Sequence, residues 1–196
     1  HREGHVDYHV TGKLLAGSIP ASILTMVYMH WAGISKSGQN TLAYALGVAL
    51  VLTAMTVAFR PLWFKVGIWL ERWITRENRP FLTILCGAIL GVLVSLSSVG
   101  AGALGVTMIL LLYPRLDMKR LIGSDIAHAV PLTIVAGIGH ASLGNVEWML
   151  LIELLIGSLP AIWLGAKLTK RLPETITRFA LCLCLLMAAN KVLKLV

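Results

Sequence analysis

The chain has 196 residues, of which 57% are hydrophobic and only 13% are charged. A soluble domain has roughly 45–50% apolar and about 25% charged residues, and a soluble core could not bury several apolar runs that each approach the ~20 residues needed to cross a bilayer. The formal charge of +8 does not indicate a nucleic-acid partner, because the Lys and Arg residues stand in short clusters between apolar runs. That distribution is typical of membrane topology, and we expect an all-α polytopic membrane protein.

Six apolar spans follow one another along the chain. They cover about 14–32, 41–59, 81–113, 122–139, 146–166 and 176–196. Five of them match one crossing helix each, whereas the third would form a helix of about 50 Å, well beyond the ~30 Å of hydrocarbon. Between the second and third spans, residues 60–80 carry five basic residues and three tryptophans, which favours an interfacial segment.

The overlong third span contains a weak point at its middle. Residues 97–105 read Ser-Ser-Val-Gly-Ala-Gly-Ala-Leu-Gly, and small residues with three glycines destabilise a helix and expose its backbone. Irregular backbone at membrane depth is tolerated only where it is buried in protein or lines a wet cavity. We therefore predict two half-helices joined by a break, the alternative being a tilted continuous helix with a small-residue packing face.

An internal duplication is visible when the chain is compared with itself at an offset of 140 residues. Nine of the 21 positions from Gly4 to Leu24 are identical to those of the second copy, including Gly-Ser-x-Pro-Ala at Gly17 and again at Gly157. We predict a truncated first repeat at 1–59 with two transmembrane helices, a linker at 60–80, and a second repeat at 81–196 with the broken helix and three transmembrane helices. About 60 residues of the first repeat are expected to be missing, so the chain is interpreted as a fragment.

The basic residues favour inverted repeats with a re-entrant broken helix. In that topology 14 basic residues share one face and three (Lys36, Lys191 and Lys194) lie on the other. If the broken segment crossed fully, the repeats would be parallel and the division would be eight against nine, contrary to the positive-inside bias.

The break is the first candidate site. Half-helix N-termini in inverted-repeat transporters present free amides and a positive dipole end to an anion. We predict that the substrate-binding residues are Ser97, Ser98, Val99, Gly100, Ala101 and Gly102, together with Ser124 in the next span. A purely structural close-packing motif is the alternative at the break.

The span after the break holds ionisable residues, which are costly inside a membrane and suggest function. Asp125, His128 and His140 are predicted to act in gating or proton coupling. Asp125 and His128 are three residues apart, so they lie on one helical face and can pair; a structural Asp–His pair is the competing interpretation. No three or four ligands converge at metal-binding spacing, and no cofactor is expected.

The residues of this region resemble a known family. The run Gly123–His140, followed by Gly144–Trp148 and Gly157–Pro160, is similar to the sulfite exporter TauE/SafE family of permeases, and Ser98–Gly105 resembles that family's glycine-rich motif. The resemblance implies a plasma-membrane permease with two homologous halves that handles sulfite, sulfonates and related organosulfur anions.

These observations together predict a secondary transporter of small anions rather than an enzyme. No GxxxxGK[ST] run is present to cradle ATP phosphates. The expected location is a bacterial inner membrane, with a small anionic substrate and the lipid bilayer as partners, no nucleic acid, and homo-oligomerisation left open. A non-transporting membrane accessory protein and a membrane-embedded metalloenzyme are the alternatives.

Overall fold

The computed structural model describes residues 6–31, 39–75, 77–97, 102–144, 146–169 and 173–194. Within these ranges the chain is all-helical and contains no strand. The helices are α1 (Tyr8–Trp31), α3 (Gln39–Ala58), α4 (Arg60–Leu70), α5 (Asn78–Ser97), α6 (Ala103–Leu112), α7 (Met118–Ser142), α8 (Trp148–Thr169) and α9 (Glu174–Lys194).

The helices confirm the predicted polytopic membrane protein. Five described helices are long and apolar enough to cross a bilayer, and a sixth span is formed if α3 and α4 are taken together. These two helices meet at an angle of 82°, and Pro61 occupies the start of α4, where its missing N–H costs nothing. The basic, tryptophan-rich segment after the second span is thus a separate helix that turns away from α3.

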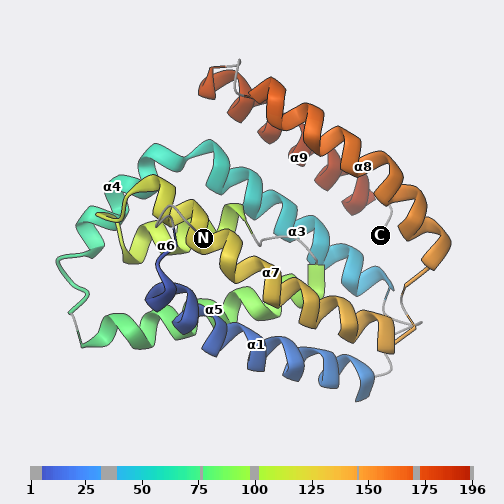
Figure 1. Ribbon diagram of the computed structural model, residues 1–196, viewed down its shortest axis with the longest axis horizontal. Coiled ribbons are helices and arrows are strands. Elements are labelled where there is room, and N and C mark those ends of the chain that lie inside the picture. Colours follow the sequence, from blue (N-terminus) through green and yellow to red (C-terminus); the bar gives the residue numbers. More distant parts are fainter. Residues whose placement is uncertain are drawn as a thin grey trace.

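The predicted break lies between Ser97, the last residue of α5, and Ala103, the first of α6. At the far ends of these helices, the Thr83 hydroxyl lies 2.9 Å from the Tyr113 hydroxyl. The chain therefore enters and leaves this unit at the same end, and Figure 1 shows α6 running back alongside α5. One detail of the prediction is wrong: α5 has 20 residues and the length of a full crossing, so only α6, with 10 residues, is a half-helix.

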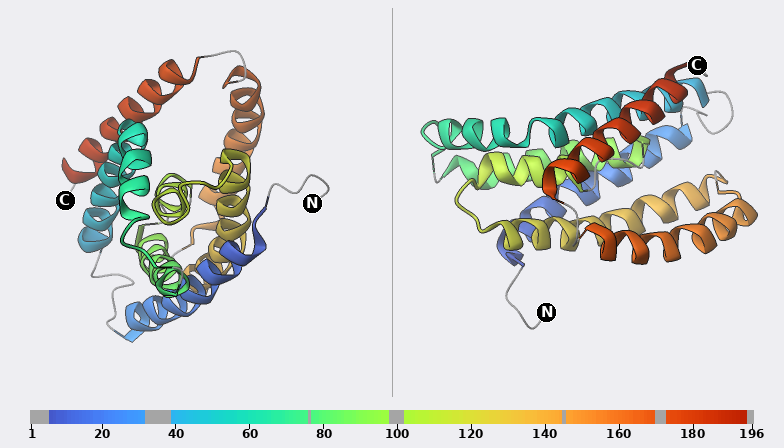
Figure 2. Two further views of the ribbon diagram at one scale, coloured as in Figure 1. Left: turned by 90° about the vertical axis from the view of Figure 1, so that its left-hand side faces the viewer. Right: turned by 90° about the horizontal axis from the view of Figure 1, so that it is seen from above.

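The short helix α6 lies at the centre of the bundle, where Figure 2 shows it end-on with other helices around it. A helix that is apolar on all sides is stable only when it is buried, and α6 reads Ala-Leu-Gly-Val-Thr-Met-Ile-Leu-Leu-Leu. The largest buried core cluster contains three of its residues together with residues of α1, α5 and α7. Its members are Val10, Leu14, Leu90, Leu104, Ile109, Leu110 and Leu121.

Helix α1 crosses α5 at very short range because both helices carry glycines at the crossing. A Cβ atom on Gly17 would collide with the backbone of Ile84, and one on Gly91 would collide with the carbonyl oxygen of Ser18. Such small-residue contacts let helix backbones approach closely in membranes. Helix α9 packs along α3, whereas the residues that the structure describes bury none of the apolar part of α8.

One end of the bundle collects the basic segments. The α4 helix, the start of α5 and the turn between α6 and α7 lie together there. Glu71 links these segments, since its carboxylate lies 3.7 Å from the guanidinium of Arg79 and 3.0 Å from that of Arg115. The basic segments 60–80 and 115–120 are thus held together by one acidic side chain.

Candidate anion-binding site

The polar residues of α7 are divided between two neighbours, α1 and α6. Toward α1, the Ser124 hydroxyl accepts a 2.8 Å hydrogen bond from the backbone N–H of Asp7, and the Ser124 carbonyl accepts a 3.3 Å bond from the Thr11 hydroxyl. One turn further along α7, Nε2 of His128 lies 3.0 Å from the Ser18 hydroxyl. Ser124 and His128 are fully buried, and both attach α7 to α1.

His140 continues this polar network to α5. Its Nε2 lies 2.9 Å from the backbone carbonyl oxygen of Ser95, whose hydroxyl donates a 2.7 Å hydrogen bond to the hydroxyl of Ser22 on α1. The three helices α1, α5 and α7 are therefore joined by buried polar contacts along much of their length. Two of the three residues predicted to act in gating, His128 and His140, belong to this network.

Asp125 points the other way, toward α6. Its Oδ1 atom lies so close to Gly105 that a Cβ atom there would collide with it. Asp125 is only 2% exposed, and among the described residues neither its Oδ1 nor Nδ1 of His128 has a hydrogen-bond partner. The Asp125–His128 pair, which was the competing structural interpretation of these residues, is thus not formed, because Asp125 lies against α6 and His128 against α1.

The predicted site at the break is only partly within the described residues. Ser98, Val99, Gly100 and Ala101 lie outside them. Ser97 is buried, and its hydroxyl donates a 2.6 Å hydrogen bond to the carbonyl of Leu93 in its own helix. Gly102 precedes α6 with φ of 136°, a conformation that residues with a side chain rarely adopt.

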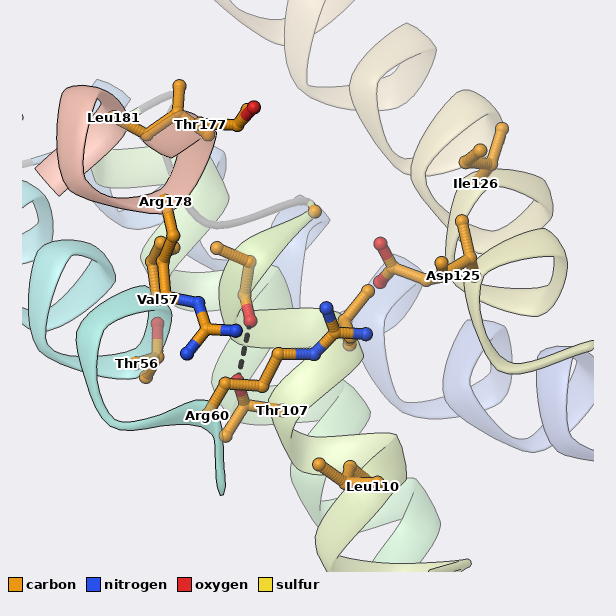
Figure 3. A pocket seen from close by; sticks show the side chains of 14 residues that line it. Thr56, Val57, Arg60, Thr107, Leu110, Asp125, Ile126, Thr177, Arg178 and Leu181 are labelled. Atoms are coloured by element: carbon orange, nitrogen blue, oxygen red, sulfur yellow. Dashed lines mark hydrogen bonds between the residues drawn. The ribbon is translucent and has the colours of Figure 1, made fainter. Parts of the chain in front are cut away.

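A cavity of about 400 Å³ lies where α6 begins. Helices α3, α4, α6, α7 and α9 all contribute to its wall, so it lies between the two predicted repeats. Figure 3 shows the guanidinium groups of Arg60 and Arg178 directed into the same space as the Asp125 carboxylate. The lining residues are Thr56, Val57, Arg60, Gly102, Ala103, Val106, Thr107, Leu110, Ile122, Asp125, Ile126, Thr177, Arg178 and Leu181.

A second hollow of about 600 Å³ adjoins this cavity and includes residues of α4, among them Phe64 and Lys65. The two hollows share Arg60, Leu110, Ile122 and Arg178 in their walls. Both arginines therefore lie between the inner cavity, which Asp125 lines, and the basic end of the bundle. The walls of the two hollows together carry three basic side chains, those of Arg60, Lys65 and Arg178.

The chemistry of this cavity suits an oxyanion. A guanidinium group offers several N–H donors in a planar fork that matches the oxygens of carboxylates, phosphates and similar groups. The N-terminus of α6 adds the partial positive charge of the helix dipole, and the apolar wall keeps the local dielectric constant low. Small-molecule sites commonly measure ~300–1,000 Å³, so the cavity can hold an anion larger than a single sulfite ion.

Sequence reasoning missed Arg60 and Arg178. Their charges were attributed to topology, since arginine at the end of an apolar span is the usual topological signal. The two residues are 118 positions apart in the sequence, and no local pattern indicates that α4 and α9 line the same cavity. Each arginine stands at the end of an apolar span and close to a polar threonine, Thr56 or Thr177. This was the signal from which a polar site could have been predicted.

Metal coordination is not supported by the side chains described. Within these parts of the chain, no three His, Cys, Asp or Glu residues come together as a metal site requires. Tetrahedral sites need three or four such ligands. His128 and His140 bind different helices instead, through Ser18 and Ser95.

Comparison with known proteins places the chain in a family. The model of the family described as Sulfite exporter TauE/SafE matches residues 1–191. The chain belongs to this family. A curated relative in Bacillus subtilis (strain 168), named "Probable membrane transporter protein YjnA", is 31% identical over 195 residues, which cover 98% of this chain and 76% of YjnA.

A second relative in the same organism, "Probable membrane transporter protein YdhB", is 26% identical over 100 residues, or 51% of this chain and 40% of YdhB. No solved structure matches the chain significantly. Family and relatives together identify a multi-pass membrane transporter protein, in agreement with the helices described above.

Proposed function

We propose that the protein is a secondary transporter that moves sulfite or organosulfur anions across a bacterial plasma membrane. The observation that carries the proposal is the cavity at the start of α6, which two arginines, an aspartate and three threonines line inside an otherwise apolar wall. Two cationic side chains and a helix N-terminus outweigh one carboxylate, so the cavity favours a negatively charged solute. The family to which the chain belongs supports sulfur oxyanions as the class.

In this mechanism Arg60 and Arg178 take the anion from the basic end and pass it to the N–H groups at the start of α6. Asp125 then faces the bound anion across the same cavity. An ionised carboxylate repels an anion, whereas a protonated one can donate a hydrogen bond to it. Proton uptake at Asp125 therefore couples anion binding to the proton gradient, which is the role predicted for this residue from sequence.

Anion flux in proteoliposomes tests the proposal. We expect counterflow of labelled sulfite or sulfoacetate above that of empty vesicles, and little flux of sulfate. Removal of a charged hydrogen bond typically costs ~1.5–3 kcal/mol, so Arg60→Gln and Arg178→Gln should each lower the apparent affinity by about tenfold or more.

Arg72→Gln is the matched control, because Arg72 carries the same charge at the same end and does not line the cavity. Flux of these anions no greater than in empty vesicles would contradict the proposed transport. Equal affinities in all three variants would show that the anion site is placed wrongly. If the wild type moves these anions and Arg178→Gln has the same apparent affinity, the protein is still a transporter, but this cavity is not its anion site.

A further inference from the structure

A separate hollow of about 370 Å³ lies at the basic end of the bundle, where α4 ends, α5 begins and α6 leads into α7. None of the described residues in its wall also lines the two hollows that Arg60 and Arg178 share. The proposed transport of anions therefore leaves this hollow without a role. Its lining residues are Glu71, Arg79, Tyr113, Pro114, Arg115 and Leu116.

Glu71 does not satisfy both arginines of this hollow. Nε of Arg115 donates a 3.0 Å hydrogen bond to Oε2 of Glu71, whereas Nη2 of Arg79 lies 3.7 Å from Oε1, which is too long for a hydrogen bond. Nε of Arg79 is buried, and no described atom accepts a hydrogen bond from it. A buried charged donor without a partner is costly, so the hollow is expected to receive a further acceptor.

The guanidinium group of Arg79 is held in place by its neighbours. Its central carbon lies 5.5 Å from the centre of the Tyr113 ring, a distance typical of a cation–π contact. The Tyr113 hydroxyl in turn lies 2.9 Å from the Thr83 hydroxyl. Donors that are already fixed lose little freedom when they bind an anion, and planar guanidinium groups match the oxygens of a phosphate.

The surroundings of the hollow indicate that it lies at the level of lipid headgroups. Trp69 and Trp73, which stand on either side of Glu71 in the sequence, are both exposed, as is Phe81 near the start of α5. Tryptophan is enriched where hydrocarbon meets the headgroups, and α5 is long and apolar enough to cross a bilayer. Basic pockets between transmembrane helices at this level bind anionic lipid headgroups.

We propose that the hollow formed by Glu71, Arg79 and Arg115 binds the phosphate group of a membrane phospholipid. Two guanidinium groups face one carboxylate there, which leaves a formal excess of positive charge for the phosphate. Arg79 and Arg115 donate hydrogen bonds to the phosphate oxygens, and the acyl chains stay in the bilayer. The bound lipid joins the end of α4 to α5 and to the turn before α7, so it stabilises this end of the bundle.

Thermal unfolding of the delipidated protein in detergent tests the proposal without measuring transport. Added phosphatidylglycerol should raise the melting temperature of the wild type, because a ligand that binds only the folded state stabilises it. Arg79→Gln and Arg115→Gln should each weaken this response by about tenfold in apparent lipid affinity. The Arg115 side chain is 86% exposed, so Arg115→Gln keeps the test valid if Arg79→Gln does not fold.

Arg72→Gln is the matched control, because Arg72 is exposed next to Glu71 and is not among the lining residues. Two further ligands identify what is recognised: diacylglycerol with the same chains, which lacks the phosphate, and glycerol phosphate, which lacks the chains. We expect neither to match the lipid.

Three results would overturn the proposal. Equal stabilisation by diacylglycerol would show that the acyl chains, and not the phosphate, are bound. Equal stabilisation by glycerol phosphate would assign the hollow to a soluble phosphate compound. An equal lipid response in the wild type and all three arginine variants would show that lipid binds elsewhere or not at all.

Discussion

The two sides of α7 use polar residues differently. Toward α1 and α5, the side chains of Ser124, His128 and His140 all contact polar atoms of neighbouring helices. Toward α6, Asp125 borders a cavity that also receives two arginines, and its Oδ1 has no hydrogen-bond partner in the part of the chain that the structure describes. Polar residues close together on one helix can therefore differ in role, because the neighbouring helix decides whether they hold the bundle together or face a solute.

The largest expected effect is on the closely packed side. Gly91→Leu would place a side chain against the backbone of Ser18, and forcing extra atoms into a packed interface costs ~1–3 kcal/mol or more. We expect the upper part of this range, about 3 kcal/mol, because a backbone cannot move aside as a side chain can. Thermal unfolding in detergent measures the effect, and Gly137→Leu is the control. A melting temperature that stays unchanged would contradict the α1–α5 crossing.

His128→Ala should be next in size. It leaves the Ser18 hydroxyl buried without its partner, at a cost of about 2 kcal/mol. A double-mutant cycle with Ser18→Ala separates the pair from other losses, and we expect a coupling of about 1 kcal/mol, as for interhelical hydrogen bonds in membranes. Additive effects of the two substitutions would show that the contact contributes nothing.

Asp125→Asn tests the cavity side. The amide keeps the shape of the side chain but can neither ionise nor release a proton, so anion flux driven by an imposed pH gradient should fall about tenfold, equivalent to ~1.4 kcal/mol. Its effect on the melting temperature should be small. Asp117→Asn is the control, since Asp117 is exposed at the start of α7 and does not line the cavity. Equal gradient dependence in Asp125→Asn and wild type would remove Asp125 from coupling.

Ser95→Ala should have the smallest effect. It removes the hydroxyl bond to Ser22 but keeps the backbone carbonyl that His140 contacts, so about 0.6 kcal/mol is expected. Thermal unfolding again provides the measurement, with Ser142→Ala as the control, whose hydroxyl bonds only within its own helix among the contacts found. A loss as large as that of Gly91→Leu would mean that the network, and not the glycine crossing, dominates this interface.

The fold could be predicted from sequence to a large extent because membrane spans depend on local composition. Apolar length places the helices, and the small residues between Ser97 and Gly105 place the break. The full length of α5 was not predictable in the same way. Its 20 residues end at Ser97, which gives α5 the length of a full crossing, so that only α6 is a half-helix.

The site was less predictable because it depends on which helices meet. Spacing correctly places Asp125 and His128 on adjacent parts of one helix, yet helix α6 lies beside one and α1 beside the other. Arg60 and Arg178 come together only because α4 and α9 both line the cavity at the start of α6. The inverted relation of the two repeats stays a prediction, as does the role of each site residue.

The shortness of α6 has a consequence for how the protein is made. Ten residues span ~15 Å, half of the hydrocarbon, and its first N–H groups cannot remain unpaired in lipid. This helix therefore cannot be released into the bilayer on its own as it leaves the insertion machinery. Its neighbours α3, α4, α5 and α7 provide the surroundings that it needs, so we expect α6 to reach its final place only after α7 has been made.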